Sequence, residues 1–411
     1  MKPFVWTAVC AWLTGKETFF MREVAIAGVA MTRFGVSEKT CIEMFCEAAC
    51  LALEESKLEP KNIEALFLGN CLGDFEEGQA HMAAHVHTAI GLPMGSPALR
   101  FENACATATV AIRQAALLVG SGVYDVVLAG GTERVAAMDT PLATRTFAMA
   151  SHSGYSAPTG ITFPGVFAMA AHMYADKYKI DIRELQECMA HVSVKNHFHA
   201  AMNPKAQFQK EISVQKVLDS FMVADPLHFL DCCPFSDGAS AVVITTKQKA
   251  LQMTDKPVFI IGTGQAAGGP VINNPDMTRI KPREVAAAQA YKQAGVTPFD
   301  IDLCELHDCF TIAEILAIEG LGFYEFGKGY DAAKNGETRL GSKKAVINPS
   351  GGLKAKGHPI GATGAAQVTE IVEQLRGLSG KRQVKGAKTG FVDTLGGEFG
   401  TVCNLILRSH P

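Results

Sequence analysis

The stretch INPSGGLKAKGHPIGATGAAQVTE, residues 347–370, decides the fold of this chain. It begins with apolar residues typical of a strand end and continues through a glycine-rich turn that carries lysines. Proline followed by small residues is typical of a first helical turn, so we expect a helix that begins with His358, Pro359 and Ile360. Free N–H groups and the positive end of the dipole at a helix N-terminus favour a neutral imidazole. We therefore predict that His358 is neutral and donates a hydrogen bond.

An earlier helix start carries a cysteine. In ENACATATVAIRQAALLVG, Cys105 follows a predicted strand at 97–101 and opens a helix of small residues, and a buried strand at 126–129 comes next. A helix N-terminus lowers the pKa of a thiol and favours the nucleophilic thiolate. Taken alone, however, one cysteine among twelve is more often a buried packing residue than a nucleophile.

A third site combines a histidine with a cysteine. His307, Asp308, Cys309 and Phe310 follow a predicted strand, and a histidine and a cysteine two residues apart can place an imidazole and a second thiol in one pocket. The alternative is a histidine bonded to backbone and a cysteine in the core. No third and fourth ligand occur at the usual zinc spacing, so we predict no metal site.

The sequence contains an internal repeat. KLEPKNIEALFLGN, residues 57–70, aligns with GVTPFDIDLCELHD, residues 295–308. The helix expected at His358 then takes the place that the Cys105 helix holds in the first copy. Two copies of a βαβαβ-type unit predict a pseudo-twofold α/β fold with mixed sheets covered by helices.

The repeat also divides the chain. We predict an N-terminal extension at residues 1–20, a first half at 21–256 and a second half at 257–411. The segment 138–231 is rich in Met, His, Ala and Gly, and PFSDGASAVVITT after it resumes the core pattern. We therefore interpret 138–231 as an insertion into the first half.

Composition excludes several classes of protein. With 48% hydrophobic and 19% charged residues and a formal net charge of −3, the chain is neither disordered nor a basic nucleic-acid binder. No apolar run reaches the ~20 residues of a membrane-spanning helix. Twelve scattered cysteines without a CxxC pair indicate buried thiols in a reducing compartment. We expect a cytoplasmic protein without nucleic-acid or membrane partners.

The repeat brings the candidate reactive groups together. It makes the helix starts at Cys105 and His358 equivalent, and the strand end at His307 lies on the same rim. Two thiols and two imidazoles suit reversible Claisen chemistry on thioesters: one thiol takes the acyl group, Cys309 moves a proton on the α-carbon, and the histidines stabilise the enolate. Gly396, in GGEFG, offers either a backbone N–H to an oxyanion or only a hairpin turn, and spacing leaves both readings open.

From residue 21 to about 408 the chain resembles the thiolase superfamily. The motifs that carry the resemblance are NACATA, SDGASAVV, HDCF, GGLKAKGHPIGATG and LGGEFG. HDCF is typical of the sterol-carrier-protein-type branch, which includes bacterial and archaeal acetyl-CoA acetyltransferase-like enzymes. The resemblance implies a five-layered αβαβα thiolase fold of two pseudo-twofold halves, with an inserted loop domain that binds coenzyme A.

The resemblance also implies roles for individual residues. By it, Cys105 is the acylated nucleophile, and His358 activates this thiol and shares the thioester-oxygen site with His307. Cys309 is the acid/base at the α-carbon. The N–H groups of Cys105 and Gly396 form a second oxyanion hole. The residues that contact coenzyme A stay unassigned.

One residue departs from the better-known thiolases. These enzymes carry their acid/base cysteine two residues before the glycine pair, where this chain has Thr394, so Cys309 must take that role. The family further implies coenzyme A as co-substrate, no tightly bound cofactor, a homodimer or larger oligomer, and in some relatives a small zinc-ribbon/OB-fold partner protein.

We therefore predict a coenzyme-A-dependent thiolase that reversibly cleaves a 3-oxoacyl-CoA, with acetoacetyl-CoA as the default substrate. A bulkier or aromatic substrate, such as benzoylsuccinyl-CoA, is an alternative. A synthase or retro-aldolase of the same superfamily is a second, although Cys309 favours the thiolase over the synthase and a retro-aldolase would not need Cys105. A non-catalytic acyl-CoA-binding scaffold is a third, and the joint presence of all four reactive side chains argues against it.

Overall fold

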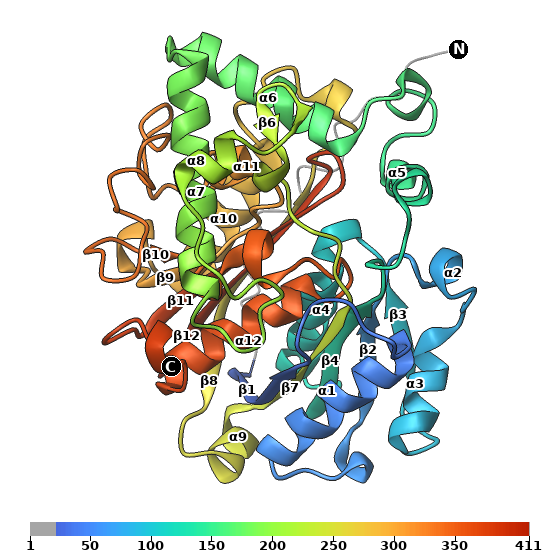
Figure 1. Ribbon diagram of the computed structural model, residues 1–411. Helices are drawn as coiled ribbons and strands as arrows, with labels where there is room; N and C mark the ends of the chain where they lie inside the picture. Colours follow the sequence, from blue (N-terminus) through green and yellow to red (C-terminus); the bar gives the residue numbers. More distant parts are fainter. Residues whose placement is uncertain (1–21, 411) are drawn as a thin grey trace, which may run out of the picture.

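The computed structural model describes residues 22–410. Ten of the strands in this range form one mixed sheet (Figure 1). The predicted extension at 1–20 lies outside the described residues. The strand order is β10-β9-β11-β12-β8-β1-β7-β4-β2-β3. The strands are β1 Val24–Met31, β2 Ala65–Gly69, β3 Ala98–Phe101, β4 Val126–Glu133, β7 Gly238–Thr246, β8 Val258–Ala267, β9 Leu303–Glu305, β10 Val346–Ile347, β11 Thr389–Gly396 and β12 Thr401–Arg408.

The sheet consists of two halves with the same pairing pattern, which confirms the predicted repeat. In the first half β2 is parallel to β3 and β4, and β7 is antiparallel to β4 and β1. In the second half β9 is parallel to β10 and β11, and β12 is antiparallel to β11 and β8. A 3-10 turn precedes the strand in each aligned copy, Pro60–Asn62 before β2 and Pro298–Asp300 before β9. The halves join where β1 and β8 pair over two residues.

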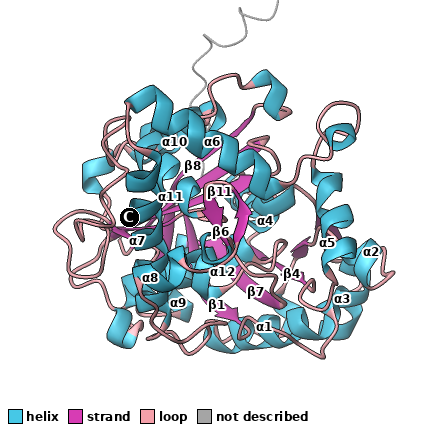
Figure 2. Ribbon diagram, turned by 45° about the horizontal axis from the view of Figure 1, so that its top comes forward, coloured by secondary structure: helices cyan, strands magenta, loops and turns pink. Residues whose placement is uncertain are grey.

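Helices cover these halves in layers. The helices α4 and α12 contact each other and strands of both halves, so they form the central layer. The helices α1 and α3 cover the outer face of the first half, and α10 and α11 cover that of the second (Figure 2). Their bounds are α1 Cys41–Glu55, α3 Met82–Ile90, α4 Thr107–Gly120, α10 Lys281–Ala294, α11 Thr311–Gly320 and α12 Thr363–Arg376. The arrangement is the predicted αβαβα fold.

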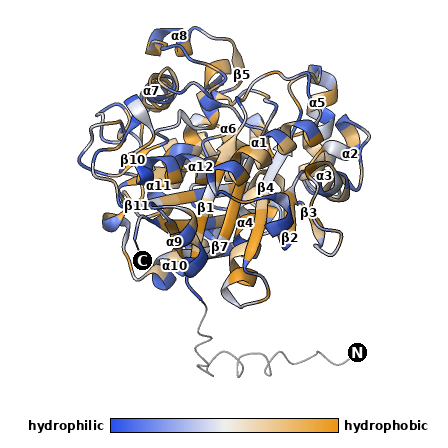
Figure 3. Ribbon diagram, turned by 90° about the horizontal axis from the view of Figure 1, so that it is seen from below, coloured by the Kyte–Doolittle hydropathy of each residue, from blue (hydrophilic) through white to orange (hydrophobic). Residues whose placement is uncertain are grey.

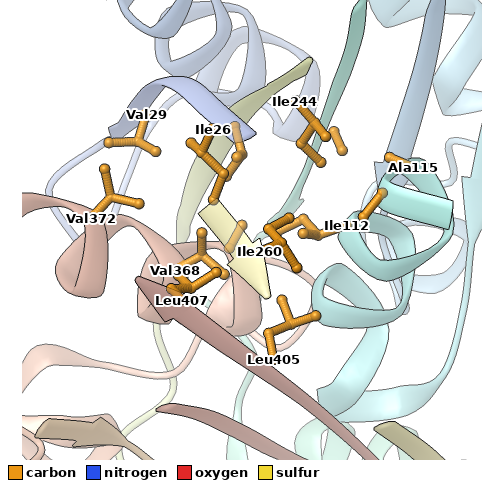
Figure 4. Close-up of a cluster of buried hydrophobic side chains, with 14 of the residues drawn as sticks. Ile26, Val29, Ile112, Ala115, Ile244, Ile260, Val368, Val372, Leu405 and Leu407 are labelled. Carbon is orange, nitrogen blue, oxygen red and sulfur yellow. The ribbon is translucent and has the colours of Figure 1, made fainter. Parts of the chain in front are cut away.

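The central layer holds the largest core. Ile112 of α4 and Val368 of α12 pack among strand residues of both halves, including Ile26, Ile244 and Leu405 (Figure 4). Hydrophobic residues concentrate in the strands beneath the helices (Figure 3). Because both halves bury apolar surface against the same two helices, the hydrophobic effect fixes how the halves sit relative to each other.

Between β4 and β7 lies a region with two long helices, which we call the inserted region. The domain boundaries, with an insertion at 138–231, stay a prediction. The elements of the inserted region are α5 Thr140–Phe147, α6 Phe163–Tyr178, α7 Ile182–Ala200, α8 Val214–Leu218 and the hairpin of β5 Met222–Ala224 and β6 Leu227–His228. Short helices α2 Gly73–Glu76 and α9 Lys247–Met253 lie outside it. Within residues 22–410 no helix combines the length and apolar character that a membrane crossing requires.

The prediction of a helix that begins at His358 was wrong. The helix α12 begins at Thr363, and a single π-helical turn, Gly352–Lys356, follows β10. His358 is extended because it pairs with Phe235 as a parallel bridge and its N–H donates to Ser236 Oγ at 2.8 Å. These partners lie far away in the sequence, so the local pattern could not show that the His358 backbone is used outside the helix.

The inserted region is tied to this segment by a neutral histidine, His199 of α7. Its Nδ1 lies 2.9 Å from the carbonyl oxygen of Asn348, and its Nε2 accepts the N–H of Leu340 at 3.1 Å. The first bond needs a proton on Nδ1 and the second needs a free lone pair on Nε2. Burial lowers the pKa of His199 to about 3, and the Lys195 ammonium adds to the shift.

Acid should therefore destabilise the protein through His199. The imidazole takes up a proton more readily in the unfolded chain. Its contribution to the free energy of unfolding is therefore complete above pH ~6.5 and is lost as the pH falls towards 3. Between pH 7 and 5 the loss is roughly 2 kcal/mol. We expect His199→Gln to remove that part of the pH slope in urea unfolding, because the amide reproduces one donor and one acceptor. The matched control, exposed His85→Gln on α3, should leave the slope unchanged; equal slopes for wild type and His199→Gln would contradict the prediction.

Candidate active site

Cys105 and His358 meet although they lie in different halves. Cys105 Sγ is 3.3 Å from His358 Nε2. Cys105 sits in the 3-10 turn Ala104–Ala106, two residues before α4 begins, and is partly exposed. The sequence correctly predicted that these two side chains converge, and the contact is within reach of proton transfer from thiol to imidazole.

The tautomer of His358 follows from Thr363, the first residue of α12. The Thr363 hydroxyl donates to the carbonyl oxygen of Pro359 at 2.9 Å, so it accepts the hydrogen bond from His358 Nδ1, 2.6 Å away. The proton is thus on Nδ1, and the lone pair of Nε2 faces the Cys105 thiol. This arrangement leaves His358 Nε2 free to accept a proton from the Cys105 thiol.

Removing the Thr363 hydroxyl should weaken the base without removing it. We expect Thr363→Val to lower the rate of Cys105 alkylation by iodoacetamide and the thiolysis rate roughly tenfold or more, because the wrong tautomer becomes accessible. Thr363→Ser keeps the hydroxyl and is the matched control, with rates close to wild type. Alkylation that is equally fast in all three proteins would show that Thr363 does not position the imidazole.

His358 is neutral, as predicted, but for a different reason. Burial lowers its pKa to about 3, with a smaller effect from the Lys356 ammonium. The prediction of a lowered thiol pKa at Cys105 was wrong. Burial raises the pKa of Cys105 to about 12, against the effect of the N–H groups of Gly397 and of Cys105 itself. The resting thiol is therefore protonated, so it would have to lose its proton before it could act as a nucleophile.

His307 is the second imidazole of the site. Its ring lies 5.2 Å from that of His358 in a T-shaped arrangement, and a ring nitrogen of each lies within 4.8 Å of the other and of Cys105 Sγ. The side chain is 1% exposed, and its Nδ1 has no hydrogen-bond partner among residues 22–410. Burial, His358 and Arg283 hold the pKa of His307 well below its usual value. A neutral imidazole with a free nitrogen is suited to donate to a substrate oxygen. The absence of a metal stays a prediction.

Cys309 is the second cysteine of the site, and its thiol lies near that of Cys105. The side chain is 8% exposed, and burial raises the pKa of its thiol, with further increases from the neighbouring Cys233 and Cys105 thiols. The Asp308 carboxylate accepts the N–H of Leu353 at 2.7 Å, which ties the loop of Cys309 to the segment that carries His358. The four reactive side chains predicted from sequence therefore form one cluster.

Glu133, which the sequence did not single out, holds the His358 loop in place. Its carboxylate accepts backbone N–H groups of Cys71 at 3.0 Å, Leu72 at 3.1 Å and Gly361 at 3.0 Å. Burial raises the pKa of Glu133 to about 7, and these N–H groups act against burial. A Cβ on Gly131 would lie 1.8 Å from the Gly361 carbonyl oxygen, so glycine is required where the loop crosses β4. The glycine pair in LAGGTE is the sequence signal that could have indicated this contact.

The N–H of Gly397, and not that of Gly396, acts to lower the pKa of the Cys105 thiol against the effect of burial. Gly397 has a φ of 64°, which favours glycine, in the turn between β11 and β12. Gly396 pairs with Thr401 and packs against the Cys105 turn, where a Cβ would lie 2.4 Å from the Asn103 oxygen. A donor role for Gly396 stays a prediction, and the structure adds Gly397 as a candidate.

Thr394 lies where better-known thiolases carry a cysteine, and its hydroxyl is occupied in the sheet. It donates to the carbonyl oxygen of Cys403 at 3.0 Å, and both residues are buried. Cys403 lies in β12. The role of Cys309 in proton transfer stays a prediction.

The chain is similar to known proteins over most of its length. The model of the thiolase N-terminal domain matches residues 24–248, and that of the thiolase C-terminal domain-like family matches residues 264–409. An acetyl-CoA acetyltransferase of Methanothermobacter thermautotrophicus is 43% identical over 93% of this chain and 98% of its own length. Human sterol carrier protein 2 is 34% identical over 96% of this chain and 74% of its own.

Among solved structures, the Ltp2-ChsH2(DUF35) aldolase superposes with a TM-score of 0.79 at 28% identity. The match covers 95% of this chain and 98% of the aldolase chain. The sequence relatives and this structure confirm the fold that the resemblance implied. The relatives also confirm the sterol-carrier-protein-type branch.

Proposed function

This chain belongs to the thiolase family, and from that premise we propose that it cleaves a 3-oxoacyl-CoA reversibly with coenzyme A through an acyl-Cys105 intermediate. As a member of the sterol-carrier-protein-type branch, it is a coenzyme-A-dependent acyltransferase. The observation that carries the residue-level proposal is the 3.3 Å contact between Cys105 and the unprotonated nitrogen of His358.

In the first half-reaction, His358 Nε2 takes the proton of Cys105, and the thiolate attacks the 3-oxo carbonyl carbon. Backbone N–H groups of Cys105 and Gly396, with Gly397 as a further candidate, would stabilise the resulting oxyanion. The bond between C2 and C3 then breaks, which leaves the acyl group on Cys105 and the enolate of acetyl-CoA. Cys309 donates its proton to C2 and releases acetyl-CoA.

In the second half-reaction, coenzyme A gives its thiol proton to the Cys309 thiolate and attacks the acyl-Cys105 carbonyl. The Cys105 thiolate leaves and recovers the proton held by His358, so the site returns to its starting state. His307 supports this proposal, because its free nitrogen can donate to the thioester oxygen of the enolate without breaking an existing side-chain bond. The same steps run backwards give Claisen condensation.

Acetoacetyl-CoA is the proposed substrate because the 43% identical relative is an acetyl-CoA acetyltransferase. The bulkier or aromatic 3-oxoacyl-CoA remains the alternative for the same mechanism. Similarity to an aldolase favours retro-aldol cleavage as a second candidate, and the need for Cys105 separates the two.

The proposed partners are acyl-CoA and coenzyme A, a second copy of this chain in a homodimer, and a small zinc-ribbon/OB-fold protein. The DUF35 component of the similar aldolase supports the last of these. We also propose a cytoplasmic location, which the many free thiols support.

The test is thiolysis of acetoacetyl-CoA by the purified chain, followed by loss of the 3-oxothioester absorbance, with mass spectrometry of Cys105 after incubation with acetyl-CoA. Turnover together with an acetyl group on Cys105 is the expected result. Acylation by a bulkier thioester, without acetoacetyl-CoA turnover, would change the substrate and keep the mechanism. If no thioester acylates Cys105, in the presence or absence of the partner protein, the proposal is overturned.

A further inference from the structure

A fifth reactive side chain, Cys233, reaches the site through the extended segment 232–236. Its backbone N–H donates to the carbonyl oxygen of Cys309 at 2.9 Å, and Cys232 forms an antiparallel bridge with Phe310. At the other end of the segment, Phe235 pairs with His358. The segment therefore lies between the loop of Cys309 and the loop of His358, and it contacts both.

The register sets Cys233 opposite Cys309. Cys232 faces Phe310 in an antiparallel bridge. In an antiparallel pair the register runs in opposite directions along the two segments, so Cys233 faces Cys309. Opposed residues of this kind point to the same side, with Cα atoms about 5.5 Å apart in a hydrogen-bonded pair. A disulfide requires Cα atoms about 4.4–6.8 Å apart. An antiparallel pair in this register therefore has the backbone spacing that a disulfide requires.

Successive side chains of an extended segment point to opposite sides, so Cys232 and Cys233 face different surroundings. The Cys232 side chain points away from that of Cys233, and its Sγ lies 3.5 Å from the carbonyl oxygen of His228. Cys232 is partly exposed, like Cys233. It therefore supplies a matched control that has the same chemistry and accessibility without the Cys309 partner.

A buried cation lies near Cys233. Lys354 is 2% exposed, and its ammonium has no hydrogen-bond partner in the described part of the chain. Burial raises the pKa of the Cys233 thiol above its usual value, and the Lys354 ammonium offsets only part of that rise. The resting thiol is therefore protonated, and it reacts with an oxidant through the thiolate that forms when the proton leaves. Cys309 is more deeply buried and is placed to react second.

We propose that Cys233 and Cys309 form a dithiol that hydrogen peroxide oxidises to a disulfide, which reversibly inactivates the enzyme while Cys105 stays free. The Cys233 thiolate attacks one peroxide oxygen to give a sulfenic acid and water. The Cys309 thiolate then attacks the Cys233 sulfur and expels a second water. Two thiol hydrogens and one peroxide thus yield a disulfide and two waters, and dithiothreitol reverses the change by thiol–disulfide exchange.

The disulfide follows from geometry alone, whereas the loss of activity rests on the proposed role of Cys309. The two are therefore tested separately. Reduced protein is treated with stoichiometric hydrogen peroxide, alkylated under denaturing conditions and digested for peptide mapping. We expect a cross-linked peptide pair that contains Cys233 and Cys309. An oxidised product confined to Cys105, or a disulfide that includes Cys105, would overturn the proposal.

Activity and acylation are then measured on the oxidised protein. Thiolysis should fall about tenfold or more and return with dithiothreitol, while acetyl-CoA still acetylates Cys105 before reduction. After the same peroxide treatment, Cys233→Ser should be as active as it was before treatment. Cys232→Ser should be inactivated like wild type. Equal inactivation of Cys233→Ser and wild type would overturn the regulatory role. A mapped Cys233–Cys309 disulfide in a protein whose Cys105 accepts no thioester would support the dithiol and reject the proposed thiolase reaction.

Discussion

Replacing Cys105 with alanine is expected to abolish acyl-enzyme formation and to lower kcat/KM for thiolysis about a thousandfold or more, because no other thiol lies against His358 Nε2 in residues 22–410. The thiol is protonated at rest, since burial raises its pKa to about 12. Its reactivity therefore depends on proton transfer to His358 rather than on a standing population of thiolate. The measurement pairs steady-state thiolysis with the mass of the intact protein after incubation with acetyl-CoA.

A matched control separates this effect from a general response to losing a thiol. Cys50 is exposed on α1, at the outer face of the first half, so Cys50→Ser should keep both acylation and turnover. The same experiment distinguishes the thiolase from a retro-aldolase. Carbon–carbon cleavage that survives in Cys105→Ala without an acyl-enzyme would contradict the thiolase mechanism and favour the aldol reaction.

Replacing Cys309 with alanine is expected to separate the two half-reactions. Acetyl-CoA should still acetylate Cys105, because Cys105, His358 and Thr363 remain in place. Thiolysis and condensation should both fall about 10²–10⁴-fold, the usual effect of removing a general acid/base. Exchange of the C2 protons of acetyl-CoA with deuterium, followed by NMR, should fall by a similar factor.

Cys309→Ala has its own control in Cys232→Ser, which removes a partly exposed thiol close to the site but on the other side of the extended segment. This variant should exchange the C2 protons at the wild-type rate. If Cys309→Ala still exchanges them at that rate, another group carries the proton, and the assignment of Cys309 would be wrong. Loss of Cys105 acetylation in Cys309→Ala would show instead that the variant disturbs the whole site.

The repeat and the reactive residue types were predictable because they leave local signals. The aligned units at 57–70 and 295–308 carry the same turn chemistry and strand pattern, and the structure gives both a 3-10 turn and a parallel strand. Signals of this kind depend on residues within a few positions of one another.

Predictions that depended on the environment failed. His358 was expected in a helix, but distant partners at Phe235 and Ser236 keep it extended. Cys105 was expected to have a lowered thiol pKa from a helix N-terminus, but α4 begins later and burial dominates. A local pattern indicates how a helix dipole would shift the pKa of a thiol. It does not show how deeply the folded protein buries that thiol, and here the effect of burial on the pKa is larger.

The sequence by itself indicated the two repeated halves and the candidate reactive side chains Cys105, His307, Cys309 and His358, and the family resemblance implied the αβαβα fold. Only the tertiary structure decided how these groups work together. It fixed the His358 tautomer through Thr363 and placed Cys233 opposite Cys309. The physical reason is distance along the chain: Cys105 and His358 are 253 residues apart, so their contact, charge state and solvent exposure arise only when both halves bury their apolar faces against the same central helices.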